Sequence, residues 1–371
     1  MKLGFVVEQL LGPSPGGTGR YTREIARAVA AQLAAAGSDP RPASTCAWHR
    51  DVRVGEIPGV AGPYRLPLGR RAVAAAWERG VGPGPRGDLD VVHAPTLLVP
   101  PKRRGGLVVT IHDAIPWTHP ETLTPRGVAF HRRMGARAAR DADVVITVSE
   151  ASAAELEPVL RLGDRLRVIP LGVSADLAVP SDTAARTRRL GLPESGWLVS
   201  VATLEPRKGL DVALAALAHP AAPDLPLAVA GSPGWGGVDL AAEARRVGLR
   251  PGRVLELGRL GDADLAAVLA GSVALVAPAR AEGFGLPVLE AMALGVPVVA
   301  SDTPALVELA AGAALHTPVG DVAALADALA RVVDDTDLRA EMSAAGRRRA
   351  ADFSWSRAGA ATIAAYADAT A

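Results

Sequence analysis

The sequence predicts an α/β protein made of two doubly wound domains, each with a parallel sheet between layers of helices. Three observations predict this fold. The chain has 371 residues, a length that favours two domains, and 49% of the residues are hydrophobic, which is enough for two buried cores. Short β-branched runs also alternate with longer Ala- and Leu-rich stretches at helical spacing, which is typical of βαβ units.

The first half of the chain shows this alternation from its beginning. Apolar runs rich in Val, Ile and Leu predict strands at residues 3–7, 44–48, 91–93, 107–111, 144–148 and 166–169. Amphipathic stretches between them predict helices near residues 20–36, 71–79, 126–140 and 150–160. We expect these elements to form a first domain over residues 1–175.

The second half repeats the pattern. It predicts strands at residues 197–202, 227–230, 254–257, 274–278, 298–300 and 313–315. It predicts helices near residues 210–218, 238–247, 264–270, 286–294, 304–310 and 323–333. Prolines at 170, 180 and 193 surround a charged, helix-like piece and predict a linker there, with a second domain over residues 176–371. The chain beyond residue 339 is expected to be helical and able to pack back across this boundary.

Charge and cysteine content exclude several classes of protein. The 40 Lys and Arg residues against 39 Asp and Glu give a net charge of +1, which argues against a nucleic-acid partner. The single cysteine, Cys46, excludes an intramolecular disulfide framework and a zinc site built from cysteines. The sequence shows neither a membrane-spanning stretch nor a signal peptide, so a cytoplasmic protein is expected.

Residues 279–290 form the most informative loop. A glycine-bearing segment follows the predicted strand, and a helix is predicted to begin near Leu286, where free amides favour phosphate or hydroxyl oxygens. Glu282 and Glu290 are eight positions apart, on a similar face of a helix. Two such carboxylates could bind the vicinal diol of a sugar. The alternative is a helix-capping acid at 282 and a solvated acid at 290.

Two other loops could bind phosphate. Arg207 and Lys208 lie between a predicted strand and a predicted helix, where two cations could hold a diphosphate; a solvent-facing basic pair is the alternative. Gly16 and Gly17 lie in a glycine-rich stretch after the first strand. This stretch matches neither a Walker motif nor a dinucleotide fingerprint, and a flexible connection is the alternative.

A histidine follows a strand of the first domain. His112 could hydrogen-bond a sugar hydroxyl or move a proton near neutral pH; a structural histidine bonded to the backbone is the alternative. His119 and Glu121 lie nearby, but no third ligand with suitable spacing follows them. The sequence therefore predicts no metal site.

Together these segments resemble the family 4 retaining glycosyltransferases, whose GT-B fold has two Rossmann-like domains facing a cleft. The resemblance covers nearly the whole chain, and its last segment is highly specific. The segments that carry it are Gly16-Gly-Thr-Gly-Arg-Tyr21, Val109-Thr-Ile-His-Asp-Ala-Ile-Pro116, Ala142-Asp-Val-Val-Ile-Thr-Val-Ser-Glu150, Val168-Ile-Pro-Leu-Gly-Val173, Leu204-Glu-Pro-Arg-Lys-Gly209 and Glu282-Gly-Phe-Gly-Leu-Pro-Val-Leu-Glu290.

The resemblance implies that the C-terminal domain binds a nucleotide-sugar donor. Glu290 would bind its ribose, Glu282 the transferred sugar, and Arg207 with Lys208 the diphosphate. The segment that supplies backbone amides to the sugar and phosphate would be Gly283, Phe284, Gly285 and Leu286. The N-terminal domain would bind an acceptor glycan, glycolipid or small-molecule glycoside.

The N-terminal domain would also reach the donor. By the resemblance, Gly16 and Gly17 would cover the phosphate, and His112 would contact the sugar or acceptor at the reacting centre. The implied reaction is hexose transfer with retention, without a metal or other cofactor. Many relatives carry Arg where Thr203 stands here, and Arg207 is expected to substitute for it. The Glu-Pro-Arg-Lys run is similar to a mannosyltransferase-like subgroup, which makes GDP-mannose the first donor to expect, before UDP- or dTDP-sugars.

Two other functions remain as alternatives. A non-catalytic nucleotide-sugar-binding module would be favoured by the loss of Lys208 or Glu290, and both are present. An NAD-dependent oxidoreductase would need a compact Gly-x-Gly-x-x-Gly turn and an acidic residue at the end of the second strand. That strand ends in Trp48 and His49 instead.

A basic helix suggests a further partner. The predicted helix at 126–140 places Arg133, Arg137 and Arg140 on one side, and basic residues exceed acidic ones over residues 1–175. This face could meet an anionic lipid surface or a lipid-linked acceptor, which would give peripheral contact at the inner membrane face. A solvated face is the alternative.

Overall fold

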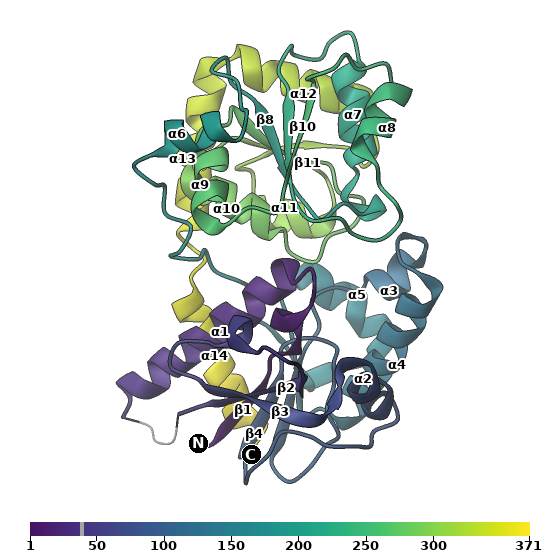
Figure 1. The fold of residues 1–371 in the computed structure, drawn as a ribbon, viewed down its shortest axis with the longest axis vertical. Helices are drawn as coiled ribbons and strands as arrows, with labels where there is room; N and C mark the ends of the chain where they lie inside the picture. The colour runs from purple at the N-terminus through teal and green to yellow at the C-terminus, as the bar shows by residue number, and fades with distance from the viewer. Residues whose placement is uncertain (38–40) are drawn as a thin grey trace. The chain divides into compact units, whose positions relative to one another are not determined.

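The computed structural model describes residues 1–37 and 41–371, which divide into two compact units (Figure 1). The first unit contains residues 1–172 and 354–371, and the second contains residues 173–353. The chain therefore leaves the first unit after Gly172 and returns to it after Phe353. Each unit has its own parallel sheet and helical layers, which confirms the predicted α/β class with two doubly wound domains.

The sheet of the first unit is parallel throughout. Its strands are β1 (Leu3–Val6), β2 (Ala43–Trp48), β3 (Ala61–Gly69), β4 (Val91–Ala94), β5 (Gly106–Thr110), β6 (Val144–Thr147) and β7 (Leu166–Val168). They are ordered β3-β2-β1-β4-β5-β6-β7. The order reverses between β1 and β4, and in doubly wound sheets ligands bind at the carboxyl ends of the strands at such a point.

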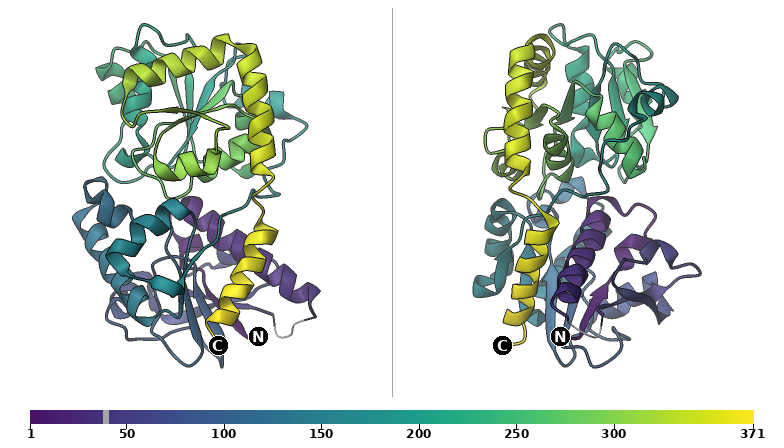
Figure 2. Two further views of the ribbon diagram at one scale, coloured as in Figure 1. Left: turned by 180° about the vertical axis from the view of Figure 1, so that it is seen from behind. Right: turned by 90° about the vertical axis from the view of Figure 1, so that its left-hand side faces the viewer.

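Helices cover both faces of this sheet. They are α1 (Gly16–Ala35), α2 (Arg70–Glu78), α3 (Ile115–Thr118), α4 (Pro125–Asp141), α5 (Glu150–Leu160) and α14 (Trp355–Asp368), with 3-10 turns at η1 (Glu8–Leu11), η2 (Arg53–Gly55), η3 (Pro120–Thr122) and η4 (Gly163–Arg165). Helices α2, α4 and α5 share one apolar core with the sheet, in which Trp77 and Met134 are fully buried. Helices α1 and α14 lie side by side (Figure 2), and Gln32 Nε2 donates to the Ser356 carbonyl at 2.6 Å.

The second unit is built on a parallel sheet of its own. Its strands are β8 (Leu198–Val201), β9 (Leu227–Ala230), β10 (Val254–Gly258), β11 (Ala274–Ala277), β12 (Val298–Ser301) and β13 (Leu315–Thr317). They are ordered β10-β9-β8-β11-β12-β13, so the order reverses between β8 and β11.

Helices also cover both faces of the second sheet. They are α6 (Thr183–Arg189), α7 (Leu210–Ala218), α8 (Leu240–Arg246), α9 (Asp262–Ala270), α10 (Leu286–Leu294), α11 (Pro304–Ala310), α12 (Val322–Asp334) and α13 (Thr336–Ala350), with a 3-10 turn at η5 (Pro206–Lys208). Helices α7, α8 and α12 share an apolar core with the sheet. Helices α9 and α10 pack together, and α10 also contacts β11 and β12.

Some elements differ from those predicted. Strand β3 was not predicted, because Pro63 and Pro67 argue against a central strand; as the edge strand of the sheet it tolerates them. Helix α1 begins at Gly16 instead of residue 20, so its first turn contains the glycines expected in a loop. The predicted linker contains α6, which packs on α9 within the second unit. Arg186 and Arg189 of α6 both bind Asp264 of α9.

Candidate active site

The loops after β8 and β11 meet at the switch point of the second sheet. Gly209, at the end of the first loop, has φ +65°, in the left-handed region that favours glycine. A Cβ at this position would lie 1.9 Å from the carbonyl oxygen of Pro278, which follows β11. Glycine is therefore required here on two grounds, and it lets the two loops approach each other closely.

Arg280 ties the same two loops together. Its guanidinium donates to both carboxylate oxygens of Asp211, at 2.7 and 2.6 Å, and to the carbonyl of Pro206 at 2.8 Å. Its backbone N–H donates to the Arg207 carbonyl at 2.7 Å. Arg280 was not among the predicted site residues, although its place in the loop after β11 was a usable signal. These bonds fix the turn that carries Arg207 and Lys208.

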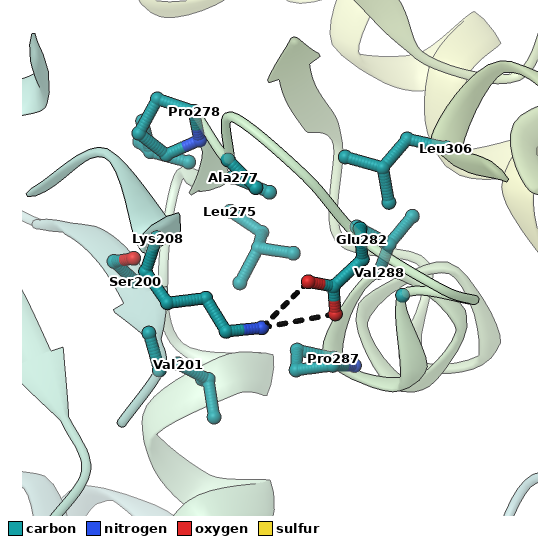
Figure 3. Close-up of a pocket in the computed structure, with 14 residues that line it drawn as sticks. Ser200, Val201, Lys208, Leu275, Ala277, Pro278, Glu282, Pro287, Val288 and Leu306 are labelled. Carbon is teal, nitrogen blue, oxygen red and sulfur yellow. Dashed lines mark hydrogen bonds and ion pairs between the residues drawn. The ribbon is translucent and has the colours of Figure 1, made fainter. Parts of the chain in front are cut away.

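Lys208, Arg207 and Glu282 form one charged cluster. The Lys208 ammonium donates to both carboxylate oxygens of Glu282, at 2.9 and 2.8 Å (Figure 3). The Arg207 guanidinium donates to Glu282 at 2.9 Å and to Glu205 at 3.0 Å. The side chains of Lys208 and Glu282 are only 13% and 12% exposed, so water screens their attraction weakly. The structure thus joins the basic pair that the sequence singled out in one loop to the acid that it singled out in another.

Burial and charge act in opposite directions on this cluster. Burial alone would raise the pKa of the Glu282 carboxyl, but the charges of Lys208 and Arg207 outweigh it and hold that pKa below its usual value. Burial, together with the charge of Arg207, lowers the pKa of the Lys208 ammonium, and Glu282 opposes this shift. At neutral pH Glu282 is ionised and offsets part of the positive charge of its two partners.

The cluster opens onto a pocket at the start of α10. Lys208 and Glu282 reach toward each other from opposite walls (Figure 3). The rest of the wall comes from the ends of β8 and β11, from Gly285 and Pro287 at the start of α10, and from α11, and includes Ser200, Val201, Ala202, Leu275, Val276, Ala277, Pro278, Ala279, Val288 and Leu306. Gly285 has φ +99° and precedes the helix. Within this turn Pro287 has no N–H, and the Val288 N–H donates to the Gly285 carbonyl at 2.9 Å. An anion or a hydroxyl oxygen is therefore favoured here mainly by the positive end of the helix dipole.

Other predicted donor residues are buried. Glu290 is 2% exposed within α10, so it is not the solvated acid of the alternative interpretation, and it is absent from the pocket wall. Phe284 is 7% exposed and packs edge-to-face on Phe353, with ring centroids 5.9 Å apart. Leu286 is also 7% exposed. Gly283, the remaining member of this segment, is buried as well.

His112 lies at the carboxyl edge of the first sheet, after β5. It donates from Nε2 to the Pro95 carbonyl at 2.8 Å, so the neutral ring keeps Nδ1 as its acceptor. Its ring packs edge-to-face on Tyr21, with centroids 4.7 Å apart. Burial lowers its pKa, so the ring is neutral at neutral pH. Gly16 and Gly17 lie exposed in the first turn of α1.

Contacts within the first unit engage part of the basic face of α4. Arg137 is 4% exposed and donates to the carbonyls of Trp77, Val99 and Pro100. Arg133 pairs with Glu78, and Arg140 with Asp141. Arg137 thus faces the protein, whereas the side chains of Arg133 and Arg140 are 57% and 66% exposed, so a surface contact through these two arginines stays a prediction.

The described residues contain neither a metal-binding cluster nor a membrane-spanning helix. Over residues 1–37 and 41–371, no group of three or more His, Cys, Asp and Glu side chains is arranged to hold a metal ion, His119 and Glu121 included. In the same part of the chain, no helix combines the length and apolar character that crossing a bilayer requires.

Two Rossmann-like units, the second with a charged cluster at its switch point, define a glycosyltransferase of the GT-B fold. Comparison with known proteins agrees. Residues 15–177 match the family model "Glycosyltransferase Family 4", and residues 187–349 match "Glycosyl transferases group 1". The chain belongs to glycosyltransferase family 4.

Relatives and solved structures extend over most of the chain. The O-antigen chain mannosyltransferase B of Escherichia coli is 31% identical over 282 residues, 74% of each chain. The MMP alpha-(1->4)-mannosyltransferase of Mycolicibacterium hassiacum is 30% identical and aligns with 95% of this chain and 94% of its own. Sucrose-phosphate synthase from Thermosynechococcus elongatus has the same fold, with a TM-score of 0.77 at 20% identity over 99% and 98% of the two chains. Anabaena Alr3699/HepE in complex with UDP-glucose gives a TM-score of 0.73 at 22% identity over 98% and 99%.

Proposed function

We propose that this glycosyltransferase moves a hexose, with mannose the first candidate, from a nucleotide diphosphate sugar to an acceptor hydroxyl, with retention and without a metal ion. The observation that carries the proposal is the cluster of Lys208, Arg207 and Glu282 beside the first turn of α10. Lys208 lines the pocket, and Arg207 binds the same Glu282 carboxylate from beside it. Two cations and the positive end of the α10 dipole thus lie close together, and both favour a diphosphate.

The donor diphosphate takes the place of Glu282 on the two cations. In the ligand-free protein this carboxylate offsets the charge of Lys208 and Arg207. A bound diphosphate supplies negative charge of its own, and the released carboxylate is then available to the hydroxyls of the transferred sugar. As the bond from the anomeric carbon to the phosphate oxygen breaks, the cations stabilise the departing charge.

The anomeric configuration is retained because the acceptor oxygen attacks the anomeric carbon on the same face from which the diphosphate departs. The acceptor oxygen bonds to the anomeric carbon while its proton passes to a departing phosphate oxygen. A double displacement would require a carboxylate nucleophile at the anomeric carbon. Glu282 is occupied with charge balance and sugar binding in this scheme, and neutral His112 serves as a hydrogen-bonding partner for the sugar or acceptor.

The identity of the sugar is supported by the relatives. Two relatives that align with 74% and 95% of this chain are named as mannosyltransferases, so GDP-mannose is the proposed donor, and UDP- and dTDP-sugars are the alternatives. Alr3699/HepE was solved with UDP-glucose. The proposed acceptor is a glycan, a glycolipid or a small-molecule glycoside.

The test is a panel of nucleotide sugars measured by thermal shift, because a ligand that binds only the folded protein raises Tm. GDP-mannose is expected to give the largest shift. Transfer to α-mannosides is then followed by NMR, with an α-anomeric product from an α-linked donor as the expected result and EDTA without effect. A β-anomeric product, or a mannosyl group trapped covalently on Glu282, contradicts the mechanism. No shift with any nucleotide sugar contradicts the function.

A further inference from the structure

The first unit carries a second charged cluster, at the carboxyl edge of its own sheet. The Glu8 carboxylate is 4% exposed and follows β1. It accepts from the Ala47 N–H at 2.9 Å and from His49 Nε2 at 2.9 Å, and it lies 3.7 Å from Arg70 Nε. These partners come from the ends of β2 and β3, so the ends of three neighbouring parallel strands meet at one buried acid.

Glu8 orients side chains that reach the surface. The side chains of His49 and Arg70 are 22% and 46% exposed, whereas the acid beneath them is buried. The backbone of His49 is also fixed, because Arg65 Nε donates to its carbonyl at 2.8 Å. A buried acid that holds an imidazole and a guanidinium in place preorganises two donors for an oxygen-rich ligand.

Trp48 adds an aromatic surface to these donors. It is 58% exposed, and its register partner in β3 is Gly69, the residue before Arg70. A single exposed aromatic residue is unremarkable. An exposed indole at the same sheet edge as oriented imidazole and guanidinium groups suits a sugar, whose ring packs on an aromatic face while its hydroxyls accept hydrogen bonds.

The strand order relates this cluster to the reacting centre. His112 follows β5, and two strands, β1 and β4, lie between β5 and β2. The ends of β2 and β5 are thus three strand spacings apart, about 14 Å at 4.7–4.9 Å per spacing. This distance is longer than one pyranose ring.

We infer that Trp48, His49 and Arg70 bind the part of the acceptor that lies beyond its reacting sugar, and that the acceptor is a glycoside of two or more sugars. This inference rests on the proposed transferase function. It assigns to the first unit a carbohydrate subsite with Glu8 as its positioning residue.

The test compares acceptors of different length. Methyl α-mannoside, α-mannobioside and α-mannotrioside are used with GDP-mannose and the wild-type enzyme, and KM is expected to fall as the acceptor lengthens. In Trp48→Ala and Arg70→Ala, KM for the two longer probes should rise roughly tenfold, the effect of losing one good contact. KM for the monosaccharide and for the donor should stay unchanged. Trp48→Phe keeps an aromatic face and should recover most of the affinity.

Arg79→Ala is the matched control, since Arg79 is an exposed arginine that follows α2 at its opposite end. Binding of the trisaccharide is also measured by calorimetry, which needs no turnover. Equal KM values for all acceptor lengths in the wild-type enzyme overturn the inference, and so does a donor-binding defect in Trp48→Ala. If the wild-type enzyme binds the trisaccharide but no nucleotide sugar, the proposed function fails while the carbohydrate subsite stands.

Discussion

The Lys208 ammonium donates a hydrogen bond to each carboxylate oxygen of Glu282, at 2.9 and 2.8 Å. The two residues are separated by 74 positions and come from loops on either side of the switch point. The contact means that Glu282 offsets part of the positive charge of Lys208 and Arg207 in the ligand-free site. Donor binding is then an exchange of one anion for another, and the variants below follow from this exchange.

Replacing Lys208 should impair catalysis more than folding. In Lys208→Met the chain keeps a stem of similar length but loses the charge that stabilises the departing diphosphate. We expect kcat to fall about 10²–10³-fold, the usual cost of removing one preorganised electrostatic contact. Steady-state kinetics with GDP-mannose checks this, with a thermal melt to show that the fold is intact. A kcat within twofold of wild type would contradict the assignment.

Glu282→Gln should strengthen binding of the nucleoside diphosphate product but slow turnover. The neutral amide no longer competes for Lys208 and Arg207, so affinity for the nucleoside diphosphate alone should increase several-fold. The transfer rate should fall because a ligand of the sugar hydroxyls is lost. Calorimetry with GDP and kinetics with GDP-mannose measure the two effects. Weaker GDP binding in the variant would show that Glu282 does not compete with the diphosphate.

Gly209→Ala should distort the turn that carries the two cations. Its Cβ would lie 1.9 Å from the Pro278 carbonyl oxygen, so the loops must separate. Gly237→Ala is a matched control, because Gly237 has the same φ of +65° and a Cβ there would meet no atom within 4 Å. Both variants carry left-handed strain of about 1–2 kcal/mol. Gly209→Ala alone should lose donor binding in a thermal-shift titration; equal losses in both variants would contradict the prediction.

Tyr366→Phe should destabilise the first unit. The phenol hydroxyl lies 2.7 Å from His93 Nδ1, and His93 Nε2 lies 2.9 Å from the Thr110 hydroxyl, which also contacts the hydroxyl of Tyr21. Removing the Tyr366 hydroxyl leaves a buried imidazole nitrogen unpaired, at a cost of about 1–3 kcal/mol. Urea denaturation measures the loss. Tyr64→Phe, at a tyrosine that is 55% exposed, should have no such effect.

His93 should also make stability depend on pH. Burial, and to a lesser degree the charge of His112, lowers its pKa from 6.5 to about 3. Between these values the unfolded chain binds a proton that the folded chain does not, so stability should decrease as pH falls from 6.5 toward 3. Urea denaturation at several pH values measures the slope. His93→Gln should show a shallower decrease, and an unchanged slope would assign the effect to other groups.

Local patterns in the sequence predicted most elements but not the contacts between loops. Apolar spacing and flanking glycine or proline placed the helices at 210–218, 286–294 and 304–310 at the bounds the structure gives. Strand β3 was not predicted, because prolines in a strand are tolerated only at a sheet edge. Whether a strand lies at the edge depends on the order of the strands in space, which local sequence patterns do not give. The carboxyl-edge rule indicated which loops carry the site.

Local sequence patterns could not predict which side chains of those loops contact each other. Lys208 and Glu282 each had a predicted ligand, and nothing in their neighbourhoods showed that they bind each other. Arg280 carries no motif, and its contact with Asp211 depends on how closely Gly209 approaches Pro278. The apolar neighbours of Glu290 in the sequence indicated that it is buried. The charge of Arg137, in contrast, favoured an exposed side chain, although this side chain is buried.

Helix α14 is supplied to the first unit by the last residues of the chain. During synthesis, residues 1–172 leave the ribosome long before Tyr366 exists to meet His93. Residues 1–172 therefore lack helix α14 while residues 173–353 are made and fold, although domains generally fold in the order of their synthesis. Completion of the first unit is thus delayed until α14 has been synthesised.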